Sequence, residues 1–462
     1  MELSFTTRQR LLLLAGFVAL VMLRLPLAWV HGRLQDEEGT VFLAYAWHRP
    51  AGEALWRAFA GYLNLGANAV TLLAVRLVRV GILPLEGVPY LTMTTALLVQ
   101  SLPALLLVTG RAAWLADRRV IVAGLLIVAT APLTEEVFLN TLHIQFHLPL
   151  AAALILALDI PASRVARLGY AVPLLVGPLC GPGAIILLPF FVLRAALDRS
   201  PARGAQAAVL GIGAAVQLLV FYSHSPIRGD VLGLPTLAAI MFVRLALLPL
   251  LTPPLATLLG RTVYASYRDG TVLWWFAVAG ALGYFGALAT TALRDRRDGA
   301  IWLIAAGLSI AAASFGRGMI VSNPEEWFSV GAAERYDFLP LVLLGLGLLA
   351  LAARAEGRHR RVRLVLCLLT LLSGAVGLFG PLREFRRGPA WPAEVAAWRQ
   401  DHDHHLATWP QDWAVDLSDR DRPCAPWAGG RPMPPQADYC EAAWLTRISE
   451  GAKRDRPPPM HR

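Results

Sequence analysis

The chain has 462 residues, of which 56% are hydrophobic and only 16% are charged, and its mean hydropathy is +0.52. These values exclude an ordinary soluble domain and indicate an integral membrane protein with many spans. The formal net charge of +10 would suit a nucleic-acid binder, but no basic stretch is interleaved with aromatic residues. We therefore expect no nucleic-acid partner and attribute the arginines to short loops that fix membrane topology.

The first hydrophobic segment, residues 11–30, is long enough to cross a bilayer. Two arginines precede it and favour a cytoplasmic N-terminus. Three adjacent carboxylates, Asp36, Glu37 and Glu38, follow it directly. They are therefore expected on the far side, close to the lipid headgroups, where a tight acidic cluster favours proton transfer, cation binding or both. The alternative is an ordinary solvated acidic loop.

Two apolar segments, 61–83 and 234–259, are expected not to cross. Counting either of them as a span would place an arginine-rich loop on the outer side. The first carries Arg76 and Arg79, so we expect an amphipathic helix on the outer surface. The second is interrupted by Arg244 and by Pro253-Pro254, so we expect it to be interfacial or re-entrant.

The remaining segments predict an all-α polytopic membrane protein with about eleven transmembrane helices. A transmembrane domain would comprise residues 1–387, with an outer loop at 31–87, and a polar tail would comprise residues 388–462, outside the membrane. Within the tail, 391–398 and 409–417 are candidates for a small ordered subdomain. Cys424 and Cys440 of the tail are either a disulfide or two unrelated thiols. The expected spans lie near 11–30, 88–109, 120–134, 148–162, 167–179, 183–195, 205–222, 272–293, 299–314, 335–353 and 362–380.

Further polar side chains gather in three loops that the topology places on the same outer face. The spacing of Asn140, His143 and His147 predicts that they share one face of a helix. Carboxylates for proton transfer, arginines for a phosphate and aromatic rings for a sugar would then lie at one surface. The candidates are Glu135, Glu136, Asn140, His143, Gln145 and His147 in the first loop, Arg317 in the second, and Glu334, Arg335 and Tyr336 in the third.

Taken together, these residues resemble bacterial membrane glycosyltransferases of the GT-C superfamily. Proteins of that family span the membrane many times, carry an acidic motif and surface helices in the first outer loop, and use polyprenyl-phosphate-linked sugars as donors. The match rests on Asp36-Glu37, the segment from Gly61, the loop from Glu135 to His147, the segment from Gly331 to Tyr336, and the polar tail.

The resemblance implies a multi-pass protein of the bacterial inner membrane with its active site facing the periplasm. The enzyme would move a sugar to a hydroxyl of a lipid, glycan or protein acceptor by an inverting displacement, as part of cell-envelope glycan synthesis. Its partners would be the polyprenyl-phosphate-sugar donor, the acceptor and the surrounding membrane lipids. It would need either no cofactor or a divalent cation, Mg²⁺ or Mn²⁺.

The family's catalytic acid corresponds to Asp36, with Glu37 as its competitor, and would act as the general base. Arg335, and after it Arg317, would hold the donor phosphate as it leaves with growing negative charge. Glu38 departs from the family's acidic pair. The other substrate-binding candidates are Tyr336, His143, Gln145, Asn140, Glu135 and Arg76, and a metal, where one is used, would lie on Asp36, Glu37 and His143.

Three other functions remain open from the sequence. An O-antigen polymerase or ligase joins lipid-linked sugars at the same face but relies on Arg and His in a large late loop. A transporter or flippase of lipid-linked sugars would need ionisable groups at mid-membrane depth. The third is a non-catalytic scaffold.

Overall fold

The computed structural model describes residues 5–224, 232–294, 299–317, 324–379, 386–410 and 413–418. This part of the chain is mostly helical, and its strands form only two short antiparallel hairpins. The all-α class is therefore confirmed. The helices are α1 (Thr7–Arg24), α2 (Pro26–His31), α3 (Ala44–His48), α4 (Ala51–Trp56), α5 (Leu65–Arg79), α6 (Val88–Gln100), α7 (Leu102–Thr109), α8 (Arg118–Ala129), α9 (Ile144–Ala157), α10 (Arg164–Leu179), α11 (Leu188–Asp198), α12 (Pro201–His224), α13 (Leu234–Phe242), α14 (Leu248–Leu250), α15 (Pro253–Arg268), α16 (Leu273–Arg294), α17 (Gly299–Arg317), α18 (Pro324–Phe328), α19 (Arg335–Arg354), α20 (Gly357–Phe379) and α21 (Trp391–Gln400); the strands are β1 (Ala58–Phe59), β2 (Tyr62–Leu63), β3 (Leu406–Thr408) and β4 (Trp413–Val415).

Six helices of the described chain are long and apolar enough to cross a membrane. A seventh crossing arises if α10 and the bent segment Pro182–Asp198, which meet at 119°, count as one span. The long apolar helices indicate a membrane-embedded protein, whereas the count of about eleven spans stays a prediction. The six segments are Leu85–Thr109, α12, α16, Gly299–Gly316, α19 and α20.

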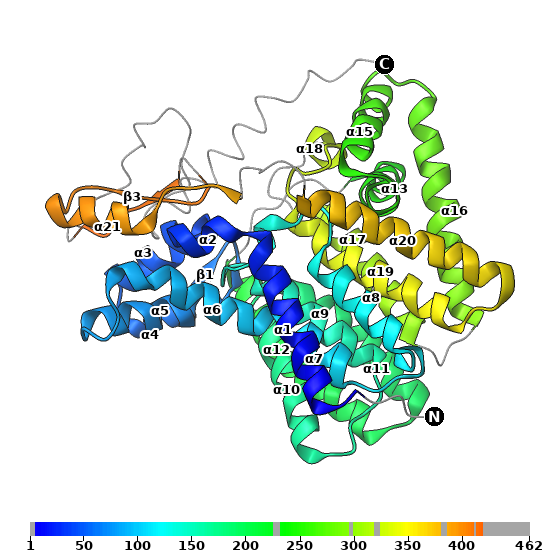
Figure 1. Cartoon of the computed structure of the whole chain (residues 1–462), viewed down its shortest axis with the longest axis horizontal. Helices are drawn as coiled ribbons and strands as arrows, with labels where there is room; N and C mark the ends of the chain where they lie inside the picture. Colours follow the sequence, from blue (N-terminus) through cyan, green and yellow to red (C-terminus); the bar gives the residue numbers. More distant parts are fainter. Residues whose placement is uncertain are drawn as a thin grey trace.

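Helix α9 is an apolar segment of the described chain that is shorter than a bilayer-crossing helix. It has 14 residues, and every side chain in it except Phe146 is buried. At 1.5 Å per residue it measures about 21 Å, short of a hydrocarbon core of roughly 30 Å. Its neighbours α6, α7, α10, α17 and α19 surround it (Figure 1). Its apolar composition therefore reflects a central place in the bundle.

The two segments expected not to cross are both absent from the membrane-length helices of the described chain. Helix α5 buries Ala67, Asn68, Thr71, Ala74 and Val75 on one side, which is the spacing of an amphipathic helix. The second segment runs as one helix from Leu234 to Leu250, with a π-helical turn at Val243–Leu247, and breaks before α15. Neither segment therefore forms a single helix of membrane-crossing length.

The carboxyl-terminal segment, which we define as residues 386–410 and 413–418, packs onto the first loop. Trp391 of α21 donates its indole N–H to the Leu85 carbonyl at 2.9 Å. Leu406 and Val415 of the second hairpin share a buried cluster with Leu34 and Leu43. Figure 1 shows α21 and β3 beside α2 and α3. The described part of the predicted tail is thus joined to the loop that carries the acidic motif.

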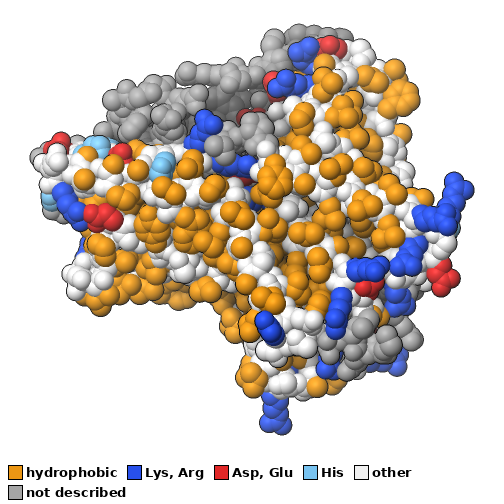
Figure 2. Space-filling view, viewed as in Figure 1, with side chains coloured by type: hydrophobic (Ala, Val, Ile, Leu, Met, Phe, Trp, Pro, Cys, Tyr) orange, Lys and Arg blue, Asp and Glu red, His pale blue; other side chains and the backbone are white. Residues whose placement is uncertain are grey.

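Hydrophobic side chains cover the broad face seen in Figure 2, and basic side chains gather at the end of the molecule near the N-terminus. Such an apolar exterior is what a chain surrounded by lipid presents.

Candidate functional site

The acidic motif begins with a buried aspartate in an unusual backbone conformation. Asp36 has φ of 42°, in the left-handed region that non-glycine residues rarely occupy, and it is 6% exposed. Its N–H donates to the Trp409 carbonyl at 2.6 Å, and its own carbonyl accepts from the hydroxyl of Thr40 at 3.2 Å. Backbone strain of this kind persists only where the surroundings hold it, and it is found most often at functional sites.

A chain of hydrogen bonds orients the Asp36 carboxylate. Arg33 is fully buried and donates to the Phe138 carbonyl at 2.6 Å and to the Gln35 side-chain oxygen at 2.7 Å. Gln35 in turn donates from its amide nitrogen to Oδ2 of Asp36 at 2.5 Å. The carboxylate is therefore aimed by side chains that are themselves fixed in place.

Glu38, two residues further on, is used differently. Its Oε1 accepts from the backbone N–H of Thr141 at 2.6 Å and from the Thr141 hydroxyl at 2.5 Å, and its Oε2 accepts from the N–H of Gln35 at 3.3 Å. Glu38 is wholly buried. Oε1 therefore holds the first loop against the loop that follows α8, and Oε2 closes a turn within the first loop.

Glu135 also lies in a buried ion-pair network. Its Oε1 accepts from Arg386 at 2.5 Å and from Arg24 at 3.4 Å. Arg24 further donates to the carbonyls of Ala129 and Ala131. The network joins α1, the loop after α8 and the carboxyl-terminal segment. The substrate-binding role predicted for Glu135 stays a prediction, and its contacts are those of a structural ion pair.

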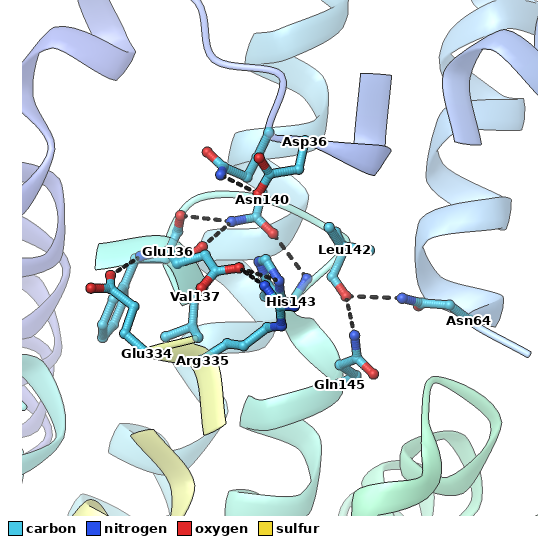
Figure 3. Close-up of polar contacts among 12 residues, drawn as sticks. Asp36, Asn64, Glu136, Val137, Asn140, Leu142, His143, Gln145, Glu334 and Arg335 are labelled. Carbon is cyan, nitrogen blue, oxygen red and sulfur yellow. Dashed lines mark hydrogen bonds and ion pairs between the residues drawn. The ribbon is translucent and has the colours of Figure 1, made fainter. Parts of the chain in front are cut away.

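Glu136, the neighbouring carboxylate, faces the predicted substrate residues. Its Oε1 accepts from Arg335 and lies 3.6 Å from Nε2 of His143. Its backbone N–H donates to Glu334 at 3.1 Å. Figure 3 shows Glu136, His143 and Arg335 pointing toward one another, with Asp36 beside Asn140. Within the described residues, Oε2 of Glu136 and Nδ1 of His143 are buried and have no hydrogen-bond partner.

Asn140 and His143 lie before a helix, so the prediction that they share a helical face with His147 is wrong. Helix α9 begins at Ile144, and Asn140 accepts from the His143 N–H at 2.9 Å with its side-chain oxygen. The Asn140 amide donates to the carbonyls of Glu136 and Phe138. Asn140 therefore closes the loop in front of α9, and the regular spacing is produced by a turn.

Burial and neighbouring charges shift the pKa values of the buried carboxylates in different directions. Burial raises the pKa of Asp36 well above its ordinary value, and the charges of Glu37 and Glu136 raise it further. Burial likewise raises the pKa of Glu37. The pKa of Glu136 is lowered despite the opposing effect of burial, because Arg335 and then His143 favour its ionised form. Burial lowers the pKa of His143 to about 4, so this imidazole is neutral near pH 7.

A second buried arginine shapes the loop that presents Arg335. Arg244, in the π-helical turn Val243–Leu247, donates to both carboxylate oxygens of Asp337 at 2.8 Å. It also donates to four backbone carbonyls, those of Glu326 and Trp327 in α18 and those of Ser329 and Ala332 in the loop between α18 and α19. Asp337 is two residues after Arg335. Arg244 thus fixes the start of α19.

The other predicted site residues differ in their contacts and exposure. The guanidinium of Arg335 stacks 5.3 Å from the Tyr336 ring, and Gln145 donates to the Leu142 carbonyl that also accepts from Asn64. Arg76 is exposed on α5. The side chain of Arg317, at the end of α17, lies outside the described residues, as do Cys424 and Cys440.

Two residues of the site, Arg33 and Arg244, escaped prediction as site residues, and Glu136 and Glu334 were candidates to which no role was assigned. Glu136 had a usable signal, because it adjoins Glu135, but nothing in a single sequence tells which of two adjacent carboxylates turns inward. Arg244 also had one, as a charge within an apolar segment, where such a charge usually has a buried partner.

Within the described residues no three His, Cys, Asp or Glu side chains are arranged to hold a metal ion. Comparison of the chain with protein-family models, with curated proteins and with solved structures gave no match. The arrangement that the residues themselves define is a buried, strained aspartate beside an arginine that is partly exposed.

Proposed function

We propose that this protein is a membrane glycosyltransferase of GT-C type. It would transfer a sugar from a polyprenyl-phosphate-linked donor to an acceptor hydroxyl at the periplasmic face of a bacterial inner membrane. The observation that carries the proposal is the Asp36 carboxylate: it is buried, held in a left-handed conformation, and lies in the electrostatic field of Arg335 and Glu136.

The proposed reaction is a single displacement. The ionised Asp36 takes the proton of the acceptor hydroxyl as its oxygen bonds to the anomeric carbon of the sugar. The bond between that carbon and the phosphate oxygen breaks at the same time, and polyprenyl phosphate leaves with the electron pair. The configuration at the anomeric carbon is inverted. A general base works best when its pKa lies near the operating pH, which is the direction in which burial moves Asp36.

Arg335 is the candidate for the leaving phosphate. Its side chain is 36% exposed while its partner Glu136 is 1% exposed, so guanidinium nitrogens remain available to a ligand. A planar guanidinium can bond two phosphate oxygens at once. Glu136 would hold the guanidinium in place and would compensate its charge in the absence of donor.

The structure favours Asp36 over the other carboxylates for the chemical step. Both oxygens of Glu38 are occupied by Thr141 and Gln35, and Glu135 is bound to two arginines. Glu37 remains the competitor of Asp36, since burial also raises its pKa.

The experiment that tests the function uses the purified full chain in proteoliposomes. Radiolabelled polyprenyl-phosphate hexoses serve as donors, and a bacterial membrane extract serves as the source of acceptors. We expect label to move into the extract together with release of polyprenyl phosphate, and the product to have the opposite anomeric configuration. Vesicles without protein give the background. Label that stays in the donor for every hexose, or a product with retained configuration, would contradict the proposal.

A further inference from the structure

The carboxyl-terminal segment touches the acidic motif at the backbone of the proposed base. Residues 34–36 and Trp409 pair in parallel: the N–H of Trp409 donates to the Leu34 carbonyl at 2.9 Å, and the N–H of Asp36 donates to the Trp409 carbonyl at 2.6 Å. These two bonds enclose Gln35, whose amide orients the Asp36 carboxylate. A residue more than 370 positions away therefore fixes the backbone N–H of Asp36.

Trp409 is itself held rigidly. It is 1% exposed, and its indole N–H donates to the Pro389 carbonyl at 2.9 Å. The Arg33 guanidinium lies 5.9 Å from the ring, and His31 meets the ring edge-on. The contact with the motif thus joins two buried, well-packed parts and does not depend on a single exposed side chain.

The packing beside this contact leaves no room for a methyl group. A Cβ at Gly39, three residues after Asp36, would lie 2.8 Å from Cγ2 of Thr408, the neighbour of Trp409. Real Cβ atoms essentially never approach a heavy atom so closely. A larger side chain at position 39 would therefore push the carboxyl-terminal segment away from the acidic motif at Thr408.

We propose that the carboxyl-terminal segment is a positioning element of the active site, in which Trp409 holds Asp36 in its left-handed conformation through a backbone hydrogen bond. The inference rests on the proposed function of Asp36. Because the bond is made by the backbone, substitution of the Trp409 side chain does not remove it selectively. An experiment can instead alter how closely the whole carboxyl-terminal segment packs against the acidic motif.

The test is a double-mutant series on Gly39 and Thr408. Gly39→Ala introduces the clash, and Thr408→Ser removes the methyl group that it meets. Gly52→Ala is the matched control, since a Cβ there meets nothing within 4 Å and Gly52 lies in the same loop, on α4. We expect Gly39→Ala to lower kcat for sugar transfer by about 10²-fold, the effect of misplacing a catalytic group by about 1 Å, with little change in the KM for the donor. Thr408→Ser in the same chain should restore kcat to within a few-fold of wild type.

A second measurement follows the seating of the segment without any assay of transfer. Ser418 lies in the segment and is 3% exposed, so a Ser418→Cys thiol should be protected from maleimide in the wild-type background. The chain for this measurement carries Cys424→Ser and Cys440→Ser, while the buried Cys180 and Cys367 stay. We expect Gly39→Ala to expose the thiol and Thr408→Ser to protect it again.

The outcomes separate the positioning role from the proposed function. Wild-type kcat in Gly39→Ala, or a loss that Thr408→Ser does not restore, overturns the positioning role. A loss that appears equally in KM, or in Gly52→Ala, overturns it too, because it would indicate a general defect of the loop. If the wild-type chain transfers no sugar, the proposed function fails, and the maleimide reaction alone then decides whether the segment is seated on the motif as the structure has it.

Discussion

The substitution Arg244→Met tests how much the buried Arg244–Asp337 ion pair contributes to the stability of the protein around the site. The side chain and its partner Asp337 are both fully buried, and their ion pair has two bonds of 2.8 Å. The substitution keeps most of the volume of the side chain but removes its charge. Asp337 then loses its arginine in a place that water does not reach.

The expected cost follows from this burial. Removing one partner of a buried ion pair destabilises a protein by about 3–5 kcal/mol, because the other charge stays in a medium of low dielectric constant. Four backbone carbonyls of α18 and of the loop that follows it lose a charged donor in the same step. Replacing both partners by apolar residues removes the charge imbalance. We therefore expect Arg244→Met with Asp337→Leu to recover a large part of the loss.

The assay is thermal unfolding in detergent micelles, followed with a thiol-reactive fluorophore. Cys180 and Cys367 are buried and become reactive when the bundle opens; Cys424→Ser and Cys440→Ser remove the other two thiols. Arg268→Met is the control. Its partner Asp269 lies 2.9 Å away, but the two side chains are 64% and 54% exposed, so no measurable shift is expected.

Two results would contradict a structural role for the Arg244–Asp337 ion pair. One is an Arg244→Met chain that melts with the wild type, which would mean that the pair contributes little to holding α19. The other is a double variant whose loss equals the sum of the two single losses, since coupled charges in direct contact must deviate from additivity.

Three further predictions concern the acidic motif and its neighbours. Glu38→Ala should lower the melting temperature, because the buried N–H and hydroxyl of Thr141 lose their acceptor, at a cost of about 1–3 kcal/mol. The kcat per folded molecule should change little. A selective loss of kcat would instead give Glu38 a catalytic role. The kcat/KM for transfer should fall as the pH is lowered through the raised pKa of Asp36, because the base must be ionised, and a profile that stays flat down to about pH 4 would contradict this. Arg335→Lys keeps the charge but not the planar pair of donors, so the KM for the polyprenyl-phosphate hexose should rise about tenfold, and an unchanged KM would remove Arg335 from the phosphate site.

Much of the fold could be predicted from composition and apolar periodicity. The membrane class, the amphipathic α5 and the interruption at 234–259 all follow from where charged residues stand in apolar segments. Span counting was less secure, because a central helix such as α9 is as apolar as a lipid-facing one. Burial against protein and burial against lipid select the same side chains.

The site could be predicted only in part. A cluster after the first apolar segment pointed to Asp36, and loop position pointed to Arg335 and His143. The choice between Glu135 and Glu136 depends on partners far away in sequence: Arg24 and Arg386 for the first, Arg335 for the second. Sequence spacing carries no information about such contacts.

The regular spacing of Asn140, His143 and His147 was misleading for a local reason. Intervals of three and four residues fit a helix, but Asn140 accepts a hydrogen bond from His143 in the turn that precedes α9. A polar residue that closes a turn in front of a helix can therefore be spaced three residues from its partner, as in a helix, without being part of one.

The single-turnover rate of Asp36→Asn beside Glu37→Gln tests directly whether Asp36 takes the proton in sugar transfer. Glu53→Gln, an exposed carboxylate on α4, serves as the control. Loss of a general base typically costs 10²–10⁴-fold in rate. We expect a loss of about that size in Asp36→Asn, with donor binding retained, and a smaller loss in Glu37→Gln. Full activity of Asp36→Asn would contradict this expectation.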